Sequence, residues 1–371
     1  YFDDGERFSF FSRSVLEILP TINFFPDIIH VNDWQAALVP TYLKTSNWDW
    51  RYDKIKTILT IHNIMYQGRF GKQILTDVLG IDQKYAGIIT YDNDVNILKG
   101  AIVTADKIIT VSPTYAEEIK TPEHGGGLHE IVKQNAYKLR GILNGLDYDF
   151  YNPATDKVIY ANYDADHLEN KAKCKELLQK EFGLEVNPDI PVVGFCSRMN
   201  MYKGFDIIKC SIERLIGELG IQFVGVGSGD KEYMDFFNYL NNKYPGKVHV
   251  SLGYSLEIGK KIYSGADIYI MPSLTEPCGL SQIVASRYGV VPIVRETGGL
   301  KDTIRDFGCL GGGNGYTFAN ASVNDFEYSV RRAVNDFKDK AEWKKKILTV
   351  MGIDFSWKKT AKEYIQTYIE L

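Results

Sequence analysis

Cysteine is scarce in this chain, and the few copies show no pairing pattern. Among 371 residues there are five cysteines and no CxxC pair: Cys174, Cys196, Cys210, Cys278 and Cys309. A scattered, odd-numbered set supports neither a disulfide framework nor a zinc site. The histidines also lack the spacing of a zinc-enzyme motif. We therefore expect no metal site, and a chain that works in a reducing compartment, the cytoplasm.

Long hydrophobic runs and a strong charge imbalance are missing too. No apolar run is long enough to span a bilayer, so no membrane partner is expected. The formal net charge is only −4, which argues against a protein that holds nucleic acid on a broad basic surface. The hydrophobic share of 44% and the charged share of 24% are those of an ordinary globular protein. The length predicts about two domains.

The start of the chain carries neither a methionine nor a signal peptide. Residues 6–19 already have the pattern of an amphipathic helix of the kind expected in the middle of a domain. We therefore expect the first domain to be truncated at its start. A sheet without its leading strands has an exposed edge and a damaged core, so activity is expected of the complete protein rather than of this chain alone.

Short β-branched runs alternate with helical periods along the chain. Eight runs are predicted as strands, at 27–30, 55–61, 107–111, 190–195, 222–226, 247–250, 268–270 and 291–294. Most are followed by a polar or glycine-bearing turn and a helix, which indicates parallel, doubly wound sheets. A stretch rich in Asp, Asn, Pro and Tyr, 144–189, interrupts the alternation. We predict a first domain over 1–147, a second over 148–355 and a closing helix over 356–371.

The most informative motif is Thr275-Glu-Pro-Cys-Gly-Leu-Ser-Gln282. It follows the predicted strand at 268–270, which delivers one carboxylate, Glu276, to the end of that strand. Residues 277–280 form a turn that opens a helix predicted over 281–288, and free amides at a helix start attract phosphate. A carboxylate beside a phosphate cradle suits a sugar nucleotide. An ordinary strand–turn–helix corner with a capping acid fits the local pattern equally well.

Two cations follow the strand at 190–195. Arg198 and Lys203 lie in Ser197-Arg-Met-Asn-Met-Tyr-Lys-Gly204. Arginine can bind a diphosphate bidentately, lysine adds a point charge, and both would stabilise the charge that grows on a departing phosphate. A solvated basic turn is the plainer interpretation of this loop alone. The nearby Gly225-Val-Gly-Ser-Gly-Asp230 is a weak dinucleotide fingerprint and fits a tight turn beside a nucleotide.

Polar residues also end strands of the first domain. Asp33 and His62 follow the first two predicted strands, at the edge where ligands bind in parallel sheets. A lone histidine there is more often a hydrogen-bonded structural residue, which is our interpretation of His30. Tyr254 follows another strand and could stack on a base, or lie in the core or at the rim. Three acidic pairs follow no buried strand and are interpreted as turn acids: Asp92-Asn-Asp94, Asp147-Tyr-Asp149 and Asp164-Ala-Asp166.

Taken together, the motifs resemble the bacterial-type glycogen and starch synthases, the family that uses ADP-glucose. The resemblance runs nearly from end to end and rests on His30-Val-Asn-Asp-Trp-Gln35, Thr60-Ile-His-Asn-Ile-Met-Tyr-Gln-Gly68, Thr110-Val-Ser-Pro-Thr-Tyr115, Leu143-Asn-Gly-Leu-Asp147, Ser197-Arg198 with Lys203-Gly204, Glu276-Pro-Cys-Gly-Leu280, Arg295-Glu-Thr-Gly-Gly-Leu-Lys-Asp302 and Asp354-Phe-Ser-Trp357. It implies a GT-B fold, two Rossmann-like doubly wound α/β domains facing a cleft. The family's N-terminal Lys-Thr-Gly-Gly-Leu loop has no counterpart here, and Thr275 stands where an aromatic residue is usual.

The resemblance also implies a reaction and a set of site residues. The reaction is a retaining, metal-independent and cofactor-free transfer of glucose from ADP-glucose to the non-reducing 4-OH of an α-1,4-glucan. Catalytic roles fall to Glu276 at the glucosyl group, His62 at the oxocarbenium-like centre, and Arg198 and Lys203 at the diphosphate. The implied donor-binding residues are Asp33, Asn63, Tyr254, Cys278, Gly279, Leu280 and Ser281. The implied acceptor or interdomain residues are Asn144, Tyr66 and Gln67, and the last helix would cross back to the first domain.

Three other functions stay open on the sequence. Another retaining GT-B glucosyltransferase, of the sucrose or trehalose type, would share the fold, although the motifs at 276–280 and 295–300 disfavour it. A catalytically silent glucan- or nucleotide-binding protein would keep the fold without turnover, but the retained acid and cations argue against decay. A dehydrogenase would rest on the weak glycine-rich turn alone. ADP-glucose and UDP-glucose are not separated, because a stacking tyrosine accepts either base.

Overall fold

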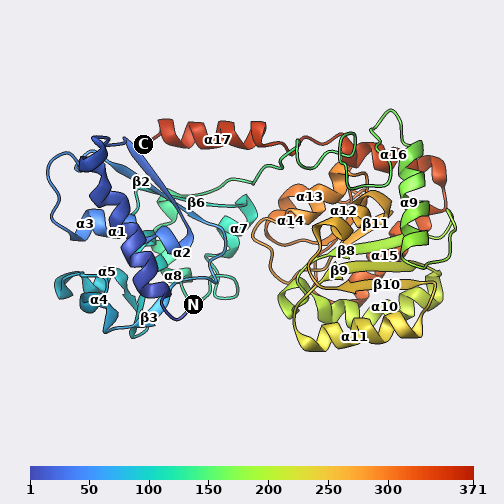
Figure 1. Ribbon diagram of the computed structural model, residues 1–371, viewed down its shortest axis with the longest axis horizontal. Helices are drawn as coiled ribbons and strands as arrows, with labels where there is room; N and C mark the ends of the chain where they lie inside the picture. Colours follow the sequence, from blue (N-terminus) through green and yellow to red (C-terminus); the bar gives the residue numbers. More distant parts are fainter. The chain divides into compact units, whose positions relative to one another are not determined.

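The computed structural model describes residues 1–371, and the chain divides into two compact units. Unit 1 contains Tyr1–Leu143 and Thr360–Leu371, and unit 2 contains Asn144–Lys359. The chain therefore passes from one unit to the other twice, and its last residues return to unit 1 (Figure 1). The first crossing lies inside the motif that begins at Leu143, near the junction expected at Asp147.

Unit 1 is built on a parallel sheet with strand order β1-β2-β6-β7. These strands are β1 (Ile28–Asn32), β2 (Lys56–Ile61), β6 (Lys107–Thr110) and β7 (Leu139–Gly141). Its helices are α1 (Asp4–Ile22), α2 (Asp33–Ala36), α3 (Leu38–Thr45), α4 (Ile74–Asp77), α5 (Ala86–Ile89), α6 (Ile97–Thr104), α7 (Pro113–Glu118) and α8 (His129–Gln134), with 3-10 turns η1 (Gln83–Tyr85) and η2 (Ala136–Lys138). A small antiparallel sheet joins β3 (Arg69–Gly71), β5 (Asp94–Asn96) and β4 (Thr90–Tyr91).

The end of the chain covers one face of the unit 1 sheet. Helix α17 (Trp357–Ile369) brings Tyr364, and the terminal Leu371, against the buried cluster of Ile58, Ile109 and Ile142. The hydroxyl of Thr360 donates to the carbonyl of Leu143 at 3.0 Å. Apolar burial and this hydrogen bond together make the last helix part of unit 1.

Unit 2 is built on a six-stranded parallel sheet with order β10-β9-β8-β11-β12-β13. Its strands are β8 (Val192–Cys196), β9 (Gln222–Gly227), β10 (Val248–Leu252), β11 (Ile268–Met271), β12 (Val291–Arg295) and β13 (Tyr316–Phe318). Its helices are α9 (Glu169–Glu181), α10 (Phe205–Leu219), α11 (Lys231–Lys243), α12 (Leu256–Gly265), α13 (Ser281–Arg287), α14 (Gly298–Thr303), α15 (Val323–Phe337) and α16 (Lys340–Met351), with the 3-10 turn η3 (Met201–Lys203).

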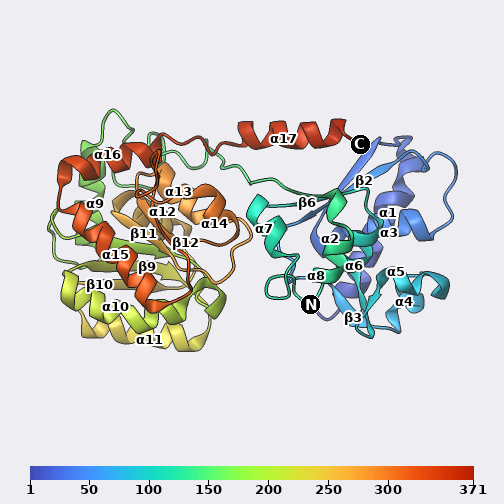
Figure 2. The ribbon, with the colours of Figure 1, turned by 180° about the vertical axis from the view of Figure 1, so that it is seen from behind.

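Both faces of the unit 2 sheet are buried, which explains why its strands read as continuous apolar runs. Val193 belongs to one core with residues of α10, α11 and α15, and the adjacent Val192 belongs to a second core with residues of α9, α12 and α13. Figures 1 and 2 show α10 and α11 on one side of this sheet and α12 and α13 on the other. Unit 2 is therefore doubly wound, as the sequence predicts.

All eight predicted strands are present, and so are the helices predicted near both ends of the chain. The sequence missed β7, β13 and the small antiparallel sheet, whose strands have only two or three residues each. Asp92 and Asn93 both have positive φ in the turn between β4 and β5, so Asp92 is a turn acid as predicted, whereas Asp94 begins β5. No helix has the length and apolar character needed to cross a bilayer.

Candidate active site

The predicted motifs of unit 2 gather at one edge of its sheet. All six strands are parallel, so their carboxyl ends meet at the same edge. Five loops leave that edge, each after one strand. They carry Arg198 and Lys203 after β8, Gly229 after β9, Tyr254 after β10, Glu276 after β11 and Gly298 after β12. Ligands of open α/β sheets bind at this edge.

Glu276 is the buried acid of this cluster. Only 6% of the residue is exposed, and its Oε2 atom lies 2.6 Å from Nζ of Lys203. The hydroxyl of Ser273 donates to the same oxygen at 3.2 Å. The lysine therefore compensates the buried negative charge, which would be costly without a partner. Sequence reasoning missed Ser273, whose only signal is its position three residues before the acid.

A second motif supports the backbone around Glu276. The guanidinium of Arg295 donates to the carbonyls of Ser273, at 2.7 Å, and Leu274. The amide of Gly299 donates to the carbonyl of Glu276 at 3.1 Å. A Cβ atom on Gly299 would lie 2.5 Å from Cα of Cys278, closer than real Cβ contacts. The two glycine-bearing turns predicted from sequence thus pack directly on each other, and only glycine permits this approach.

The turn after Glu276 presents unused backbone amides. The N–H groups of Cys278, Gly279 and Leu280 donate to no acceptor in the structure. Gly279 has φ +71, and α13 begins at Ser281. Unsatisfied amides at a helix start form an anion-binding feature. The turn therefore has the donors that the phosphate-cradle interpretation requires.

Asn144 contacts the thiol of Cys278 in this turn. Burial raises the pKa of the Cys278 thiol to about 11, although hydrogen bonding from Asn144 opposes this shift. The thiol is therefore protonated at neutral pH and is no nucleophile. Asn144, the first residue of unit 2, reaches the site through this contact.

The loop that carries Arg198 is held by the glycine-rich turn after β9. Met199 forms a parallel bridge with Gly229, and a Cβ on Gly229 would lie 2.6 Å from the carbonyl carbon of Met199. Gly229 therefore allows these two loops to pack closely. Arg198 itself is exposed and has no ion-pair partner, so its guanidinium is available to an anion.

Tyr254 is the most exposed of the predicted residues in unit 2. Its exposed fraction is 89%, and its ring makes no aromatic contact within the protein. It follows β10 and Gly253, whose φ is +151. A tyrosine with both faces open can stack on a planar ligand at modest entropic cost.

In unit 1, Asp33 and His62 are brought together. The Asp33 carboxylate accepts a hydrogen bond from the backbone N–H of His62 at 2.8 Å. Asp33 also has φ +55, an unusual value for a non-glycine residue that often marks functional sites. Nε2 of His62 lies 2.9 Å from Oδ1 of Asn32, which orients the imidazole. Sequence reasoning missed Asn32, although it adjoins Asp33 in the same motif.

The other predicted residues of unit 1 divide into exposed and structural ones. Oδ1 of Asn63 accepts the amide of Met65 at 3.0 Å and shapes the loop, whereas Tyr66 is 59% exposed. Gln67 is buried, and its amide donates to the carbonyls of Ile64 at 3.0 Å and Gly126 at 2.7 Å. Both of these hydrogen bonds are internal, so we expect Gln67 to support the loop rather than to contact a substrate.

His30 has the structural role that the sequence predicts. Its ring nitrogens lie 2.7 Å from the Thr60 hydroxyl and 2.9 Å from the Tyr368 hydroxyl. Burial, and to a smaller extent repulsion by His62, lowers the pKa of His30. The ring is therefore a neutral link between the sheet and α17. No group of three or more His, Cys, Asp or Glu side chains is arranged to hold a metal ion.

Doubly wound parallel sheets whose loops carry an acid, two cations and free amides define the chain as a glycosyltransferase of the GT-B fold. The family described as "Starch synthase catalytic domain" matches residues 1–134, and "Glycosyl transferases group 1" matches residues 179–349. A glycogen synthase from Caldicellulosiruptor saccharolyticus is 45% identical over the whole chain and 79% of its own length. One from Clostridioides difficile is 44% identical over 100% of the chain and 78% of its own length.

A solved structure agrees with these relatives. The catalytic domain of starch synthase IV from Arabidopsis thaliana, bound to ADP and acarbose, superimposes with a TM-score of 0.92. It is 37% identical, and the match covers 99% of this chain and 77% of that one. The chain belongs to the glycogen synthase family, and the predicted enzyme class is confirmed. A truncated first domain stays a prediction.

Proposed function

We propose that this glycogen synthase uses ADP-glucose and adds glucose, with retention of configuration, to the non-reducing 4-OH of an α-1,4-glucan. The observation that carries the proposal is the cluster at the end of β11, where the buried Glu276 meets Lys203 beside the free amides of the next turn. The related starch synthase binds ADP and acarbose, a nucleotide and a glucan-like ligand. Both kinds of ligand fit the donors and acceptors of this chain.

The unit 2 groups divide the work on the donor between charge and hydrogen bonding. We expect Arg198, Lys203 and the amides of residues 278–280 to bind the diphosphate, and Glu276 to accept hydrogen bonds from glucose hydroxyls. As the glucosyl–oxygen bond breaks, negative charge grows on the diphosphate, where fixed cations stabilise it most. Two cations and several amides can supply this stabilisation without a metal ion, so we propose a metal-independent reaction.

The unit 1 groups are proposed to act on the sugar. Asp33 and Asn63 are oxygen-bearing side chains suited to glucose hydroxyls, and His62 is held by Asn32 with one ring nitrogen still unused. We propose that His62 stabilises the oxocarbenium-like centre and that Tyr66 contacts the acceptor glucan. Tyr254 is proposed to stack on the adenine ring of the donor. All five cysteines are free, which favours the cytoplasm as the compartment.

Donor and acceptor assays test this proposal. The full-length protein is supplied with ADP-glucose or UDP-glucose, and with glycogen, maltooligosaccharide, fructose 6-phosphate or glucose 6-phosphate as acceptor. We expect incorporation of glucose into the two glucans, faster from ADP-glucose, and none into the sugar phosphates. Transfer to a sugar phosphate would favour the sucrose- or trehalose-type alternative. Binding of glycogen without any turnover would favour the silent binding protein.

A further inference from the structure

One cavity of unit 2 lies away from the site described above. It has a volume of about 640 Å³ and lies between α9, α16 and the residues that follow α12. This volume is in the range of small-molecule sites. Five lysines and three acids line it, namely Lys171, Lys173, Lys175, Lys340 and Lys344 with Glu169, Glu176 and Asp267.

The floor of this lysine pocket holds two buried ammonium groups and one carboxylate. Lys175 pairs with Asp267 at 2.7 Å, and both side chains are about nine-tenths buried. Lys171 is also buried, and its Nζ donates to the carbonyls of Ser264 at 3.1 Å and Ala266 at 3.2 Å. The carbonyls at the end of a helix together carry about half a negative charge. They therefore fix the Lys171 ammonium but cancel only part of its charge. The floor therefore keeps a positive charge that no acid pairs.

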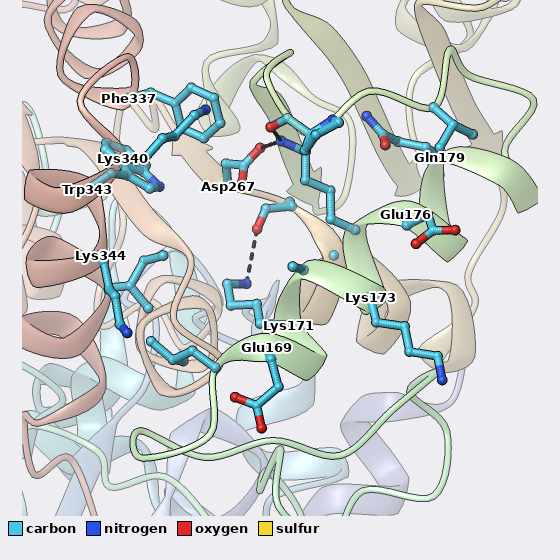
Figure 3. A pocket seen from close by; sticks show the side chains of 18 residues that line it. Glu169, Lys171, Lys173, Glu176, Gln179, Asp267, Phe337, Lys340, Trp343 and Lys344 are labelled. Carbon is cyan, nitrogen blue, oxygen red and sulfur yellow. Dashed lines mark hydrogen bonds and ion pairs between the residues drawn. The ribbon is translucent and has the colours of Figure 1, made fainter.

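The rim adds further positive charge from α16. Figure 3 shows Lys340 and Lys344 on this helix, on the side of the pocket opposite Lys171. Lys340 lies 3.5 Å from the largely exposed Asp189 and makes a cation–π contact with Phe337. Lys344 has no ion-pair partner. Two acids, Glu169 and Glu176, oppose these charges and are exposed to solvent, as Lys340 and Lys344 are, so all four charges are partly screened.

The walls between these charges are apolar and aromatic. Trp343 is 3% exposed and packs edge-on against Phe337, with ring centroids 5.4 Å apart. Its indole N–H has no hydrogen-bond acceptor in the protein. Leu168, Pro188 and Ile347 complete the wall. Such a pocket fits a ligand with a compact anionic head and a ring-sized, weakly polar body.

We propose that the lysine pocket binds a small molecule that carries a phosphate monoester. Lys340 and Lys344 contact the phosphate, Lys171 contributes its field from below, and the body of the ligand covers Trp343. Phosphate is favoured over carboxylate because separate lysines act as point charges around a dianion, whereas a planar carboxylate is best matched by the fork of an arginine. The site is separate from the donor site and does not rest on the proposed reaction.

Phenyl phosphate is a suitable probe because it combines the dianion with a ring. Its affinity is measured by calorimetry on the full-length protein with saturating ADP, which occupies the donor site. We expect saturable binding that is at least about tenfold weaker in Lys340→Gln/Lys344→Gln. The matched control, Lys180→Gln/Lys338→Gln, removes the same charge from exposed positions outside the pocket and should bind as the parent protein does.

Two further ligands define the chemistry of the site. Benzoate and phenol are expected to bind at least about tenfold more weakly than phenyl phosphate, because one has less charge and the other has none. Equal affinity of the pocket and control variants would overturn the proposal, and so would the absence of saturable binding. Tighter binding of benzoate would refute the assignment to phosphate. Thermal unfolding of both variants checks that each is folded.

Discussion

Replacing Gly299 by alanine tests whether the packing of two turns positions Glu276, the proposed catalytic acid. The added Cβ would lie 2.5 Å from Cα of Cys278, and closer still to its carbonyl oxygen. Favourable carbon contacts need about 3.5 Å, so the two turns must separate by about 1 Å. The obstacle is backbone rather than a flexible side chain, and the amide of Gly299 also donates to the carbonyl of Glu276. The displacement is therefore transmitted to the acid.

The expected result of Gly299→Ala is a loss of activity larger than its loss of stability. A misplacement of about 1 Å at a reacting centre costs about 100-fold in kcat/KM, while overpacking costs about 1–3 kcal/mol of unfolding free energy. Glucose incorporation from ADP-glucose and thermal unfolding measure the two effects. Gly217→Ala is the matched control, since this helical glycine of α10 has nothing within 4 Å of the added Cβ.

The control should keep full activity and gain up to about 1 kcal/mol, because alanine is the better helix former. Unchanged kcat/KM in Gly299→Ala would refute the reasoning, since the turns would then tolerate a Cβ without moving the acid. A comparable loss in Gly217→Ala would also refute it, because the effect would then not depend on contact with the Cys278 backbone.

Three more predictions follow from single side chains. Lys203→Met leaves the buried Glu276 carboxylate without its cation, so the free energy of unfolding should fall by about 2 kcal/mol after allowing for the partly exposed lysine. We also expect kcat to fall about 100-fold, and unchanged Tm and kcat would contradict this prediction. Tyr254→Ala should raise KM for ADP-glucose about tenfold by removing a stacking platform, whereas Tyr254→Phe should bind the donor normally; equal KM in both variants would exclude stacking. The pKa of His30 is lower in the folded protein, so as the pH falls the unfolded chain binds a proton more readily than the folded one. The contribution of the neutral ring to folding stability is therefore present above pH 6.5 and decreases below it. In His30→Gln the decrease in Tm from pH 7.5 to 5.5 should be smaller than in the parent protein, and an equal decrease would contradict the neutral state of His30.

The sequence predicted the strands and the loops that carry chemistry, because both have strong local signals. Buried strands such as β11 are continuous apolar runs. A motif such as 275–282 combines an acid, a proline and a glycine within a few residues. Glu276 and Lys203 could each be selected in this way. Their ion pair could not be predicted from pattern alone, because it depends on β8 and β11 being neighbours in the sheet.

Residues and contacts with weak local signals were missed. Ser273 and Asn32 are small polar residues, and only their hydrogen bonds to Glu276 and His62 distinguish them. The hydrogen bonds of the Gln67 amide to two backbone carbonyls of unit 1 have no local signal either. The close packing of Gly229 against the loop that carries Arg198 has no local signal either. In each case tertiary contacts between distant segments decide the role, and a single sequence does not contain them.

The most direct test of the central claim is the rate of glucose transfer from ADP-glucose to glycogen by Glu276→Gln, measured beside its affinity for ADP. The amide preserves the size of the side chain and removes the charge that pairs with Lys203. If Glu276 is the acid that acts on the glucosyl group, transfer should fall about 1000-fold or more, while ADP still binds with an affinity close to that of the parent protein. Transfer at the parent rate with unchanged ADP binding would contradict the account.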